Sequence, residues 1–161
     1  ETVSYSARIL DYTGTVLYIE SIQTRRSDML FTRECDYGVR VMRALSSGEL
    51  FSVSKICEME YLSSAIAYKV TRKLEKAGLV ESHRGVNGGY CLKRPLSDIS
   101  LYDVCTAIDP DILLMECMKA GHCCPRNTED APCIVHHEFC RLQSLLLQGM
   151  KAKFLSELFC K

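Results

Sequence analysis

The sequence predicts a mainly α-helical chain with one short β-hairpin and a long helix near its C-terminal end. Apolar residues recur at helical spacing in three short segments between residues 32 and 78. The glycine-rich stretch 78–95 then alternates in the manner of a hairpin. Residues 134–159 return to a helical pattern. One side of that pattern holds Val135, Phe139, Leu142, Leu145 and Leu146.

Local sequence signals mark the ends of the first three helices. Thr32 can cap the first helix and Ser52 the second. Gly78 ends the third, because glycine adopts the left-handed conformation that commonly terminates a helix. The apolar stripe of this third helix is Ile66, Val70 and Leu74, and its basic side chains are Lys69, Arg72, Lys73 and Lys76. We therefore expect the third helix to present a positive face to solvent.

The hairpin is predicted from its turn and from two short strand-like runs. Residues 79–83 and 90–93 are the expected strands, with Asn-Gly-Gly at 87–89 between them. That turn sequence is typical of positions that need a positive φ. Ser100 and Asp103 then form a capping box, which predicts the start of a fourth helix.

Length and composition limit the classes of protein that need to be considered. The chain has 161 residues, enough for one compact domain with appendages, and its 47% hydrophobic content is ordinary for a globular core. The sequence contains no run of eighteen apolar residues, so it predicts no membrane span. No secretion signal is evident. We therefore expect a cytoplasmic protein. In a reducing compartment, its ten cysteines indicate metal binding or redox chemistry rather than disulfides.

The zero net charge hides an uneven distribution along the chain. Residues 29–95 hold eleven Lys or Arg against seven Asp or Glu, whereas residues 96–161 hold six against nine. A basic segment beside an acidic remainder is typical of a nucleic-acid-binding module attached to a second functional part.

Four parts follow from these patterns. Residues 1–28 are an extension with a strand-like segment, to which we assign no function; Met29 resembles a natural start. Residues 29–110 form the helical domain with its hairpin, and residues 111–133 form a cysteine-rich loop. Residues 134–161 contain the long helix and a tail. The apolar side of this helix is too wide for a lone surface helix, so we expect it to pair with a second copy in a homodimer.

The predicted elements are those of a winged helix-turn-helix: two short helices, a turn, a basic third helix and a glycine-rich hairpin. Such a third helix fits the major groove of double-stranded DNA, and the hairpin wing can place an arginine at the minor groove. No nucleophile–base pair, phosphate loop or HExxH motif is present. We therefore expect a DNA-binding protein rather than an enzyme, with no small-molecule substrate.

Three segments resemble the Rrf-type winged-helix transcription regulators, the family that includes IscR, NsrR, RirA and CymR. They are DYGVRVMRAL (36–45), YKVTRKLEKAGLVESHRGVNGGYCLKRP (68–95) and ISLYDVCTAID (99–109). The resemblance extends from Met29 almost to the C-terminus. It implies a homodimeric regulator, usually a repressor, that binds a partly palindromic operator.

The resemblance also implies roles for individual residues of the DNA-binding domain. Residues in the base-facing turn of the recognition helix would be Ala65, Tyr68 and Lys69. Residues placed for phosphate contacts would be Arg72 and Lys73. The wing would supply Arg84 at its tip and Gly88 and Gly89 at its turn. Tyr68 and Lys69 differ from the residues of IscR, which leaves the operator sequence open.

Residues 117–140, CMKAGHCCPRNTEDAPCIVHHEFC, concentrate five cysteines and three histidines. Three thiolates at irregular loop spacing suit an iron–sulfur cluster, because sulfur ligands hold iron and a loop can wrap the cluster. The resemblance to cluster-binding members implies ligands of a 2Fe–2S or 4Fe–4S centre. The candidates are Cys117, either Cys123 or Cys124, Cys133, and a fourth ligand that is His136 or Asp36 from the partner subunit.

Zinc binding and thiol chemistry are two further possibilities for the loop. Three cysteines and one histidine can bind structural zinc, although the spacing is not the paired CxxC of zinc ribbons. A thiol–disulfide switch could use the adjacent Cys123 and Cys124. We interpret Cys140 as a thiol on the long helix, and His122 and His137 as bystanders. The most economical hypothesis is a regulator whose operator affinity depends on a loop-bound cluster that senses redox state, nitric oxide or iron supply.

Overall fold

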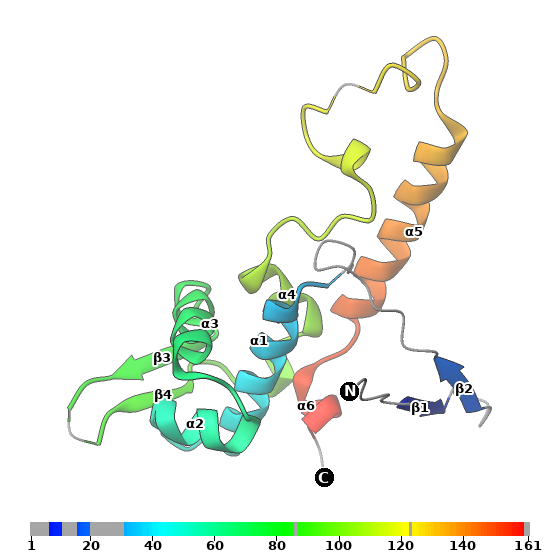
Figure 1. Ribbon diagram of the computed structural model, residues 1–161. Helices are drawn as coiled ribbons and strands as arrows, with labels where there is room; N and C mark the ends of the chain where they lie inside the picture. The colour runs from blue at the N-terminus through cyan, green and yellow to red at the C-terminus, as the bar shows by residue number, and fades with distance from the viewer. Residues whose placement is uncertain (1–6, 11–15, 20–30, 86, 123, 160–161) are drawn as a thin grey trace, which may run out of the picture.

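The computed structural model describes residues 7–10, 16–19, 31–85, 87–122 and 124–159 (Figure 1). Its α-helices are α1 (Arg33–Ala44), α2 (Val53–Glu60), α3 (Ser64–Lys76), α4 (Leu101–Ile108), α5 (Ile134–Lys151) and α6 (Leu155–Phe159). Its strands are β1 (Ala7–Leu10), β2 (Val16–Ile19), β3 (Val80–His83) and β4 (Gly89–Leu92). Short 3-10 helices are η1 (Leu45–Ser47), η2 (Leu96–Asp98) and η3 (Glu116–Met118). The predicted mainly helical fold with one glycine-rich hairpin is confirmed.

The strands β1 and β2 form a separate antiparallel pair, with Ala7 opposite Ile19. The strand expected in the N-terminal extension corresponds to β2. The other residues of the predicted extension, 1–6, 11–15 and 20–28, lie outside the described residues.

The core of the predicted DNA-binding domain lies between α1, α2, α3 and α4, with the β3–β4 hairpin at one side (Figure 1). Val70 and Leu74 of the predicted apolar stripe are fully buried, and Ile66 packs against the core from the side. Gly38 lets α1 approach α4, because a Cβ at this position would lie 2.9 Å from Ile108 Cγ1. Fully buried residues beneath α3 include Val41, Met42, Leu45, Ile56 and Val104. Together they fix the position of α3.

Most of the predicted helix ends are confirmed. The Ser52 hydroxyl accepts a hydrogen bond from the Lys55 backbone N–H at 3.2 Å. Ser100 and Asp103 form the expected capping box. Gly78 follows α3 with a φ of +72°. Thr32 occupies the N-cap position of α1, but its side chain makes no capping hydrogen bond with the helix backbone.

The hairpin forms where the sequence predicts it, but its turn glycines serve a different purpose. The strands pair from Val80 opposite Leu92 to His83 opposite Gly89. Gly85 has the positive φ, +124°, whereas Gly88 and Gly89 do not. A Cβ on Gly88 would lie 2.3 Å from His83 O, and one on Gly89 would lie 2.3 Å from Phe51 O. The expectation of positive φ across the Asn-Gly-Gly turn was therefore wrong, because these glycines provide space for neighbouring backbone.

The long C-terminal helix is shorter than its pattern predicts. It ends at Lys151, and the chain turns back to the DNA-binding domain before α6 begins. Two backbone hydrogen bonds hold this return, from Leu155 N–H to Ile99 O and from Leu101 N–H to Lys153 O, both at 2.9 Å. Leu155 therefore belongs to the domain core, where it is fully buried, and does not continue the long helix.

Helix α5 extends away from the DNA-binding domain and carries the cysteine-rich loop at its far end (Figure 1). Buried Gln143 ties it to the segment that follows α4: its side-chain N–H donates to Ile112 O at 2.7 Å, and its Oε1 accepts from Leu114 N–H at 2.9 Å. Exposed apolar residues on α5 are Ile134, Val135, Leu142 and Leu145. None of the described helices is long and apolar enough to cross a membrane.

Candidate DNA interface and cysteine-rich loop

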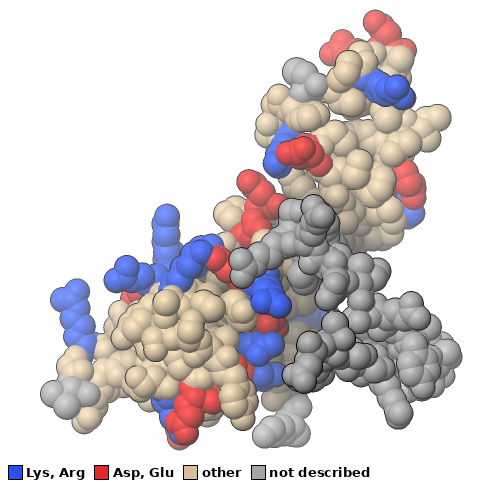
Figure 2. Space-filling view, viewed as in Figure 1, with Lys and Arg blue, Asp and Glu red and all other residues tan. Residues whose placement is uncertain are grey.

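The outer face of α3 exposes most of the side chains that were predicted to contact DNA. Ala65, Lys69 and Arg72 are exposed, and Tyr68 is 52% exposed despite its large apolar ring. Figure 2 shows Lys and Arg side chains gathered over α3 and at the hairpin. Arg84 is exposed beside the hairpin turn. Basic side chains thus lie on both the helix and the wing.

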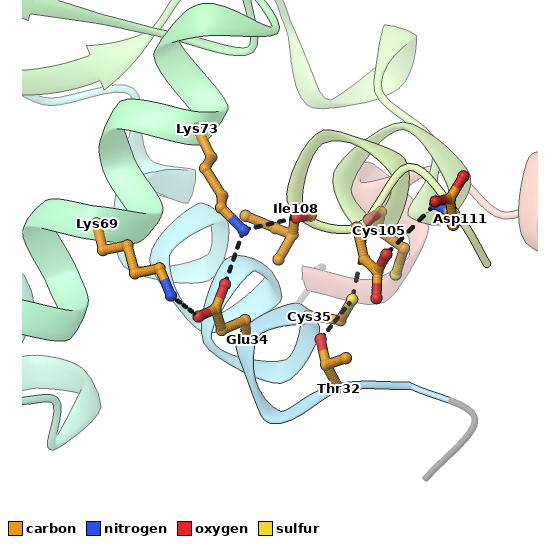
Figure 3. Close-up of polar contacts among 9 residues, drawn as sticks. Thr32, Glu34, Cys35, Lys69, Lys73, Cys105, Ile108 and Asp111 are labelled. Carbon is orange, nitrogen blue, oxygen red and sulfur yellow. Dashed lines mark hydrogen bonds and ion pairs between the residues drawn. The ribbon is translucent and has the colours of Figure 1, made fainter. Parts of the chain in front are cut away.

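Glu34 of α1 holds two of the predicted DNA-contacting lysines (Figure 3). One carboxylate oxygen pairs with Lys69 Nζ, and the other lies 2.7 Å from Lys73 Nζ. Hydrogen bonds from these two lysines hold the pKa of Glu34 below its usual range. Lys73 Nζ also donates to the Ile108 carbonyl at 2.8 Å, so this lysine joins α3 to the end of α4.

This arrangement changes the expected roles of the basic residues. Lys73 is half-buried and has two partners within the chain, whereas Arg72 is exposed. A phosphate that recruits Lys69 or Lys73 must compete with Glu34, while Arg72 can contact DNA without that competition. The sequence pattern missed Glu34 because it lies 35 residues before Lys69 and 39 before Lys73.

The structure brings Cys117, His136 and Cys140 together at the start of α5. Cys117 Sγ in η3 lies 3.5 Å from His136 Nδ1, and Cys140 Sγ lies 3.4 Å from His136 Nε2. All three side chains are half-buried. Cys140 was not predicted to be a ligand, although its i+4 spacing from His136 on a helix indicates that the two share a face.

Cys133 and Cys124 belong to the same loop but are held through Asn127. Cys133 is the N-cap residue of α5, and its backbone N–H donates to Asn127 Oδ1 at 2.9 Å. The Asn127 backbone N–H in turn donates to Cys124 O at 3.0 Å. Both cysteines are half-buried and carry free thiols. Cys123, the alternative second ligand, lies outside the described residues.

The loop supplies thiol donors that a metal centre can use. A cluster distributes its cysteine ligands over several irons, whereas a single zinc ion is held by four ligands around one point. The free thiols of Cys117, Cys124 and Cys133 supply the sulfur donors that iron–sulfur centres use.

Asp36 lies apart from this loop within one chain. It is on α1 in the DNA-binding domain, and its carboxylate pairs with Arg40 Nε at 2.9 Å. The loop is at the opposite end of α5 (Figure 1). Asp36 can therefore reach a cluster only from a second subunit, which is the arrangement that the resemblance implies.

A different group of ligand-type side chains lies on the wing, and the sequence pattern did not predict it. Glu81, His83 and Cys91 bring a carboxylate oxygen, an imidazole nitrogen and a thiol sulfur within 4.8 Å of one another. A lone cysteine in a strand, such as Cys91, indicates no more than a small core or surface residue. The strand register could have indicated the group, because Glu81 faces Cys91 and His83 follows two residues later on the same face.

Comparisons with known proteins agree with this architecture. Residues 31–161 match the family described as Rrf2, iron-dependent transcriptional regulator. Protein aau3 of Rhizobium meliloti (strain 1021) is 33% identical over 128 residues, which cover 78% of this chain and 77% of that protein.

Two solved structures show the same fold at low sequence identity. CymR, the global cysteine regulator of B. subtilis, is 22% identical with a TM-score of 0.66, over 80% of this chain and 95% of that chain. IscR of T. potens is 22% identical with a TM-score of 0.62, over 81% of this chain and 86% of that chain. The family match covers the DNA-binding domain, the loop and α5, and the homologues are transcription regulators rather than enzymes. The chain belongs to the Rrf2 family of winged-helix transcription regulators.

Proposed function

We propose that the protein is a homodimeric repressor that reads a partly palindromic operator with α3 and the β3–β4 wing. The observation that carries this proposal is the gathering of Lys and Arg side chains over α3 and at the hairpin (Figure 2). Ala65, Tyr68 and Lys69, all exposed, would reach base edges, Arg72 would contact the phosphate backbone, and Arg84 would lie at the minor groove. Lys73 contributes positive charge while it supports α3 from the end of α4.

Dimerisation would occur through α5. Val135, Leu142 and Leu145 are 58%, 38% and 52% exposed, and they follow one another at helical spacing on this helix. Pairing two copies of α5 removes these side chains from water and places two recognition helices at two half-sites.

The cysteine-rich loop is proposed to hold an iron–sulfur cluster that controls operator binding. Cys117, Cys133 and either Cys123 or Cys124 would supply thiolates, and His136 or Asp36 of the partner subunit the fourth ligand. Cys140 joins the candidates because its sulfur lies beside His136. Oxidation, nitrosylation or loss of such a cluster would change the number of loop residues that are bound to iron and the net charge of the loop.

A chain of contacts supports communication between the loop and α3. Gln143 couples α5 to residues 112 and 114, which continue into η3 and Cys117. The same segment begins at the end of α4, where the Ile108 carbonyl accepts a hydrogen bond from Lys73 of α3. A rearrangement of the loop would therefore reach the recognition helix through residues 108–114, which makes the loop and the operator two linked binding sites.

The two halves of this proposal can be tested on one anaerobic preparation. Selection from random double-stranded DNA should yield an inverted-repeat operator, and its affinity should fall steeply with salt concentration. Absorption spectra with iron and acid-labile sulfide assays should show a cluster, and the sulfide count should distinguish 2Fe–2S from 4Fe–4S. Absence of any preferred sequence would contradict operator binding, and a colourless protein with zinc or no metal would contradict the cluster.

A further inference from the structure

The β3–β4 wing carries three half-exposed ligand-type side chains on one face. Cys91 Sγ lies 3.4 Å from His83 Nε2 and 3.6 Å from Glu81 Oε1, and His83 Nε2 lies 3.2 Å from the same carboxylate oxygen. The side chains of His83 and Glu81 are 51% and 47% exposed, so an ion can reach them from solvent.

These distances match the edges of a tetrahedron around zinc. Zinc lies about 2.3 Å from cysteine sulfur, and about 2.0–2.2 Å from histidine nitrogen and carboxylate oxygen, so tetrahedral ligand atoms are separated by about 3.3–3.6 Å. The observed separations of 3.4, 3.6 and 3.2 Å agree with that range to within about 0.1 Å. An ion could therefore bind with little rearrangement of the three side chains.

The backbone beneath this cluster is held firmly. Tyr90, the neighbour of Cys91, exchanges two backbone hydrogen bonds with Phe51, at 3.0 Å and 2.8 Å. Gly89 packs so closely on the Phe51 carbonyl that no side chain fits there. A preorganised backbone lowers the cost of collecting ligands around an ion.

We propose that Glu81, His83 and Cys91 form a zinc-binding site on the wing, separate from the cysteine-rich loop. An imidazole, a thiolate and a carboxylate are the ligand types that zinc takes, and three protein ligands leave the fourth position to water. Partial burial and the Glu81 carboxylate raise the pKa of the Cys91 thiol. Binding therefore releases the thiol proton to solvent as the sulfur–zinc bond forms.

The wing site would adjust the charge that the protein presents to DNA, an effect that rests on the proposed function. Without metal, Glu81 leaves one negative charge in the cluster; with zinc, the carboxylate and thiolate together neutralise the ion. Arg84, the proposed minor-groove residue of the wing, directly follows His83. Removing one negative charge beside it should raise operator affinity severalfold and steepen the salt dependence by up to about one unit of log–log slope.

The site can be measured without DNA, with Co²⁺ as a spectroscopic probe and Zn²⁺ as competitor. The full chain would be used with Cys117, Cys123, Cys124 and Cys133 changed to alanine, after circular dichroism has verified its fold. One equivalent of Co²⁺ should give a thiolate charge-transfer band and tetrahedral d–d bands, and Zn²⁺ should remove both. Cys91→Ser or His83→Gln should weaken binding by more than about a hundredfold, since loss of a second-shell partner alone costs about 10–100-fold.

Two matched controls separate the site from general effects. Cys57→Ser removes a half-buried thiol elsewhere, and Ser82→Ala alters β3 between the two strand ligands. Both should bind Co²⁺ as the parent does. If the loop variant does not fold, wild type and Cys91→Ser should still differ by one equivalent of zinc. Equal zinc content in these two proteins, or spectra unchanged by Cys91→Ser, would overturn the site.

Operator binding is then measured by fluorescence anisotropy in the same folded background. Zinc should tighten binding severalfold in the protein with an intact wing and should leave Cys91→Ser unchanged. Equal affinities with and without zinc would overturn the wing's effect on DNA. Failure of the proposed function would look different, because the protein would then show no operator preference whether zinc is present or absent.

Discussion

The DNA-facing surface and the cysteine-rich loop are built in opposite ways. Beneath α3 and the wing lie fully buried residues such as Val70, Leu74 and Val80. The described loop residues between 116 and 133 are exposed or half-buried, and side-chain hydrogen bonds such as those of Asn127 hold them. The DNA-facing surface is therefore supported by a buried apolar core, whereas the described part of the loop has no fully buried residue and depends on hydrogen bonds for its shape.

The largest effect on stability should come from a substitution at Gly89, where the wing packs against Phe51. Gly89→Ala places a Cβ 2.3 Å from Phe51 O, so the hairpin must separate from the residue on which it packs. We expect a loss of about 3 kcal/mol in the free energy of unfolding, and a loss of operator binding. Urea denaturation and anisotropy titration measure the two.

Gly149→Ala provides the matched glycine substitution on α5. No atom lies within 4 Å of the added methyl group within the described chain, so this change should stabilise the helix by about 0.5–1 kcal/mol. If the two glycine variants lost similar stability, the claim that close backbone packing fixes the wing would be wrong.

The link between α5 and the loop should give the next largest effect. Gln143→Leu removes a buried amide and leaves Ile112 O and Leu114 N–H without their partner, which should cost about 2–3 kcal/mol. It should also speed the loss of iron from the anaerobic protein. Gln148→Leu, an exposed change on the same helix, is the control and should leave both quantities nearly unchanged.

Substitutions on the recognition helix should distinguish contacts with DNA bases from contacts with the DNA backbone. Lys69→Ala should change the base preference at one operator position by about 1–3 kcal/mol, because lysine can donate to guanine acceptors. Arg72→Ala should weaken all sequences alike and reduce the log–log salt slope by about one, because this exposed side chain can contact a phosphate without competition from Glu34. Sequence selection and salt titrations of both variants measure these effects. An unaltered base preference for Lys69→Ala would remove that residue from base recognition.

The smallest effect should come from the carboxylate that holds these lysines. Glu34→Gln frees Lys69 and Lys73 and removes a negative charge near DNA, so operator affinity should rise about twofold to tenfold. Weaker DNA binding in this variant would indicate that Glu34 instead positions the lysines for DNA.

The same pair of contacts makes a small contribution to the pH dependence of stability. The pKa of Glu34 is lower in the folded chain, so its ion pairs stabilise the fold above the unfolded pKa of about 4.3. That contribution, about 0.5–1 kcal/mol for partly exposed pairs, is lost as the pH falls through the folded value. Denaturation of wild type and Glu34→Gln should therefore differ at pH 7 and converge in acid.

Local patterns were sufficient to predict α1 to α4, the hairpin and the exposed Lys69 and Arg72 of α3. Ser100 and Asp103, for example, predict their capping box because every interacting group lies within four residues. Contacts between distant segments could not be predicted in this way. The pairing of Glu34 with Lys69 and the turn of the chain after Lys151 depend on how α1, α3 and the core pack.

The candidate sites also differ in whether local sequence patterns or contacts between distant segments reveal them. Cysteine clustering points to the loop, and helical spacing places Cys140 on the same face as His136, but only the fold shows that Cys117 lies beside His136. The wing cluster depends on strand register, since Glu81 and Cys91 are ten residues apart and meet only when β3 and β4 pair. A ligand set spread over two strands leaves no continuous motif in the sequence.

We propose that the state of the loop sets the affinity of the DNA-facing surface. An anaerobic operator titration of one preparation before and after cluster removal, with iron, sulfide and zinc counted in each sample, measures this coupling. We expect the affinity to change at least about tenfold, a coupling of about 1.4 kcal/mol, and Cys117→Ala to abolish the difference. Equal operator affinity in the cluster-containing and cluster-free samples would contradict it.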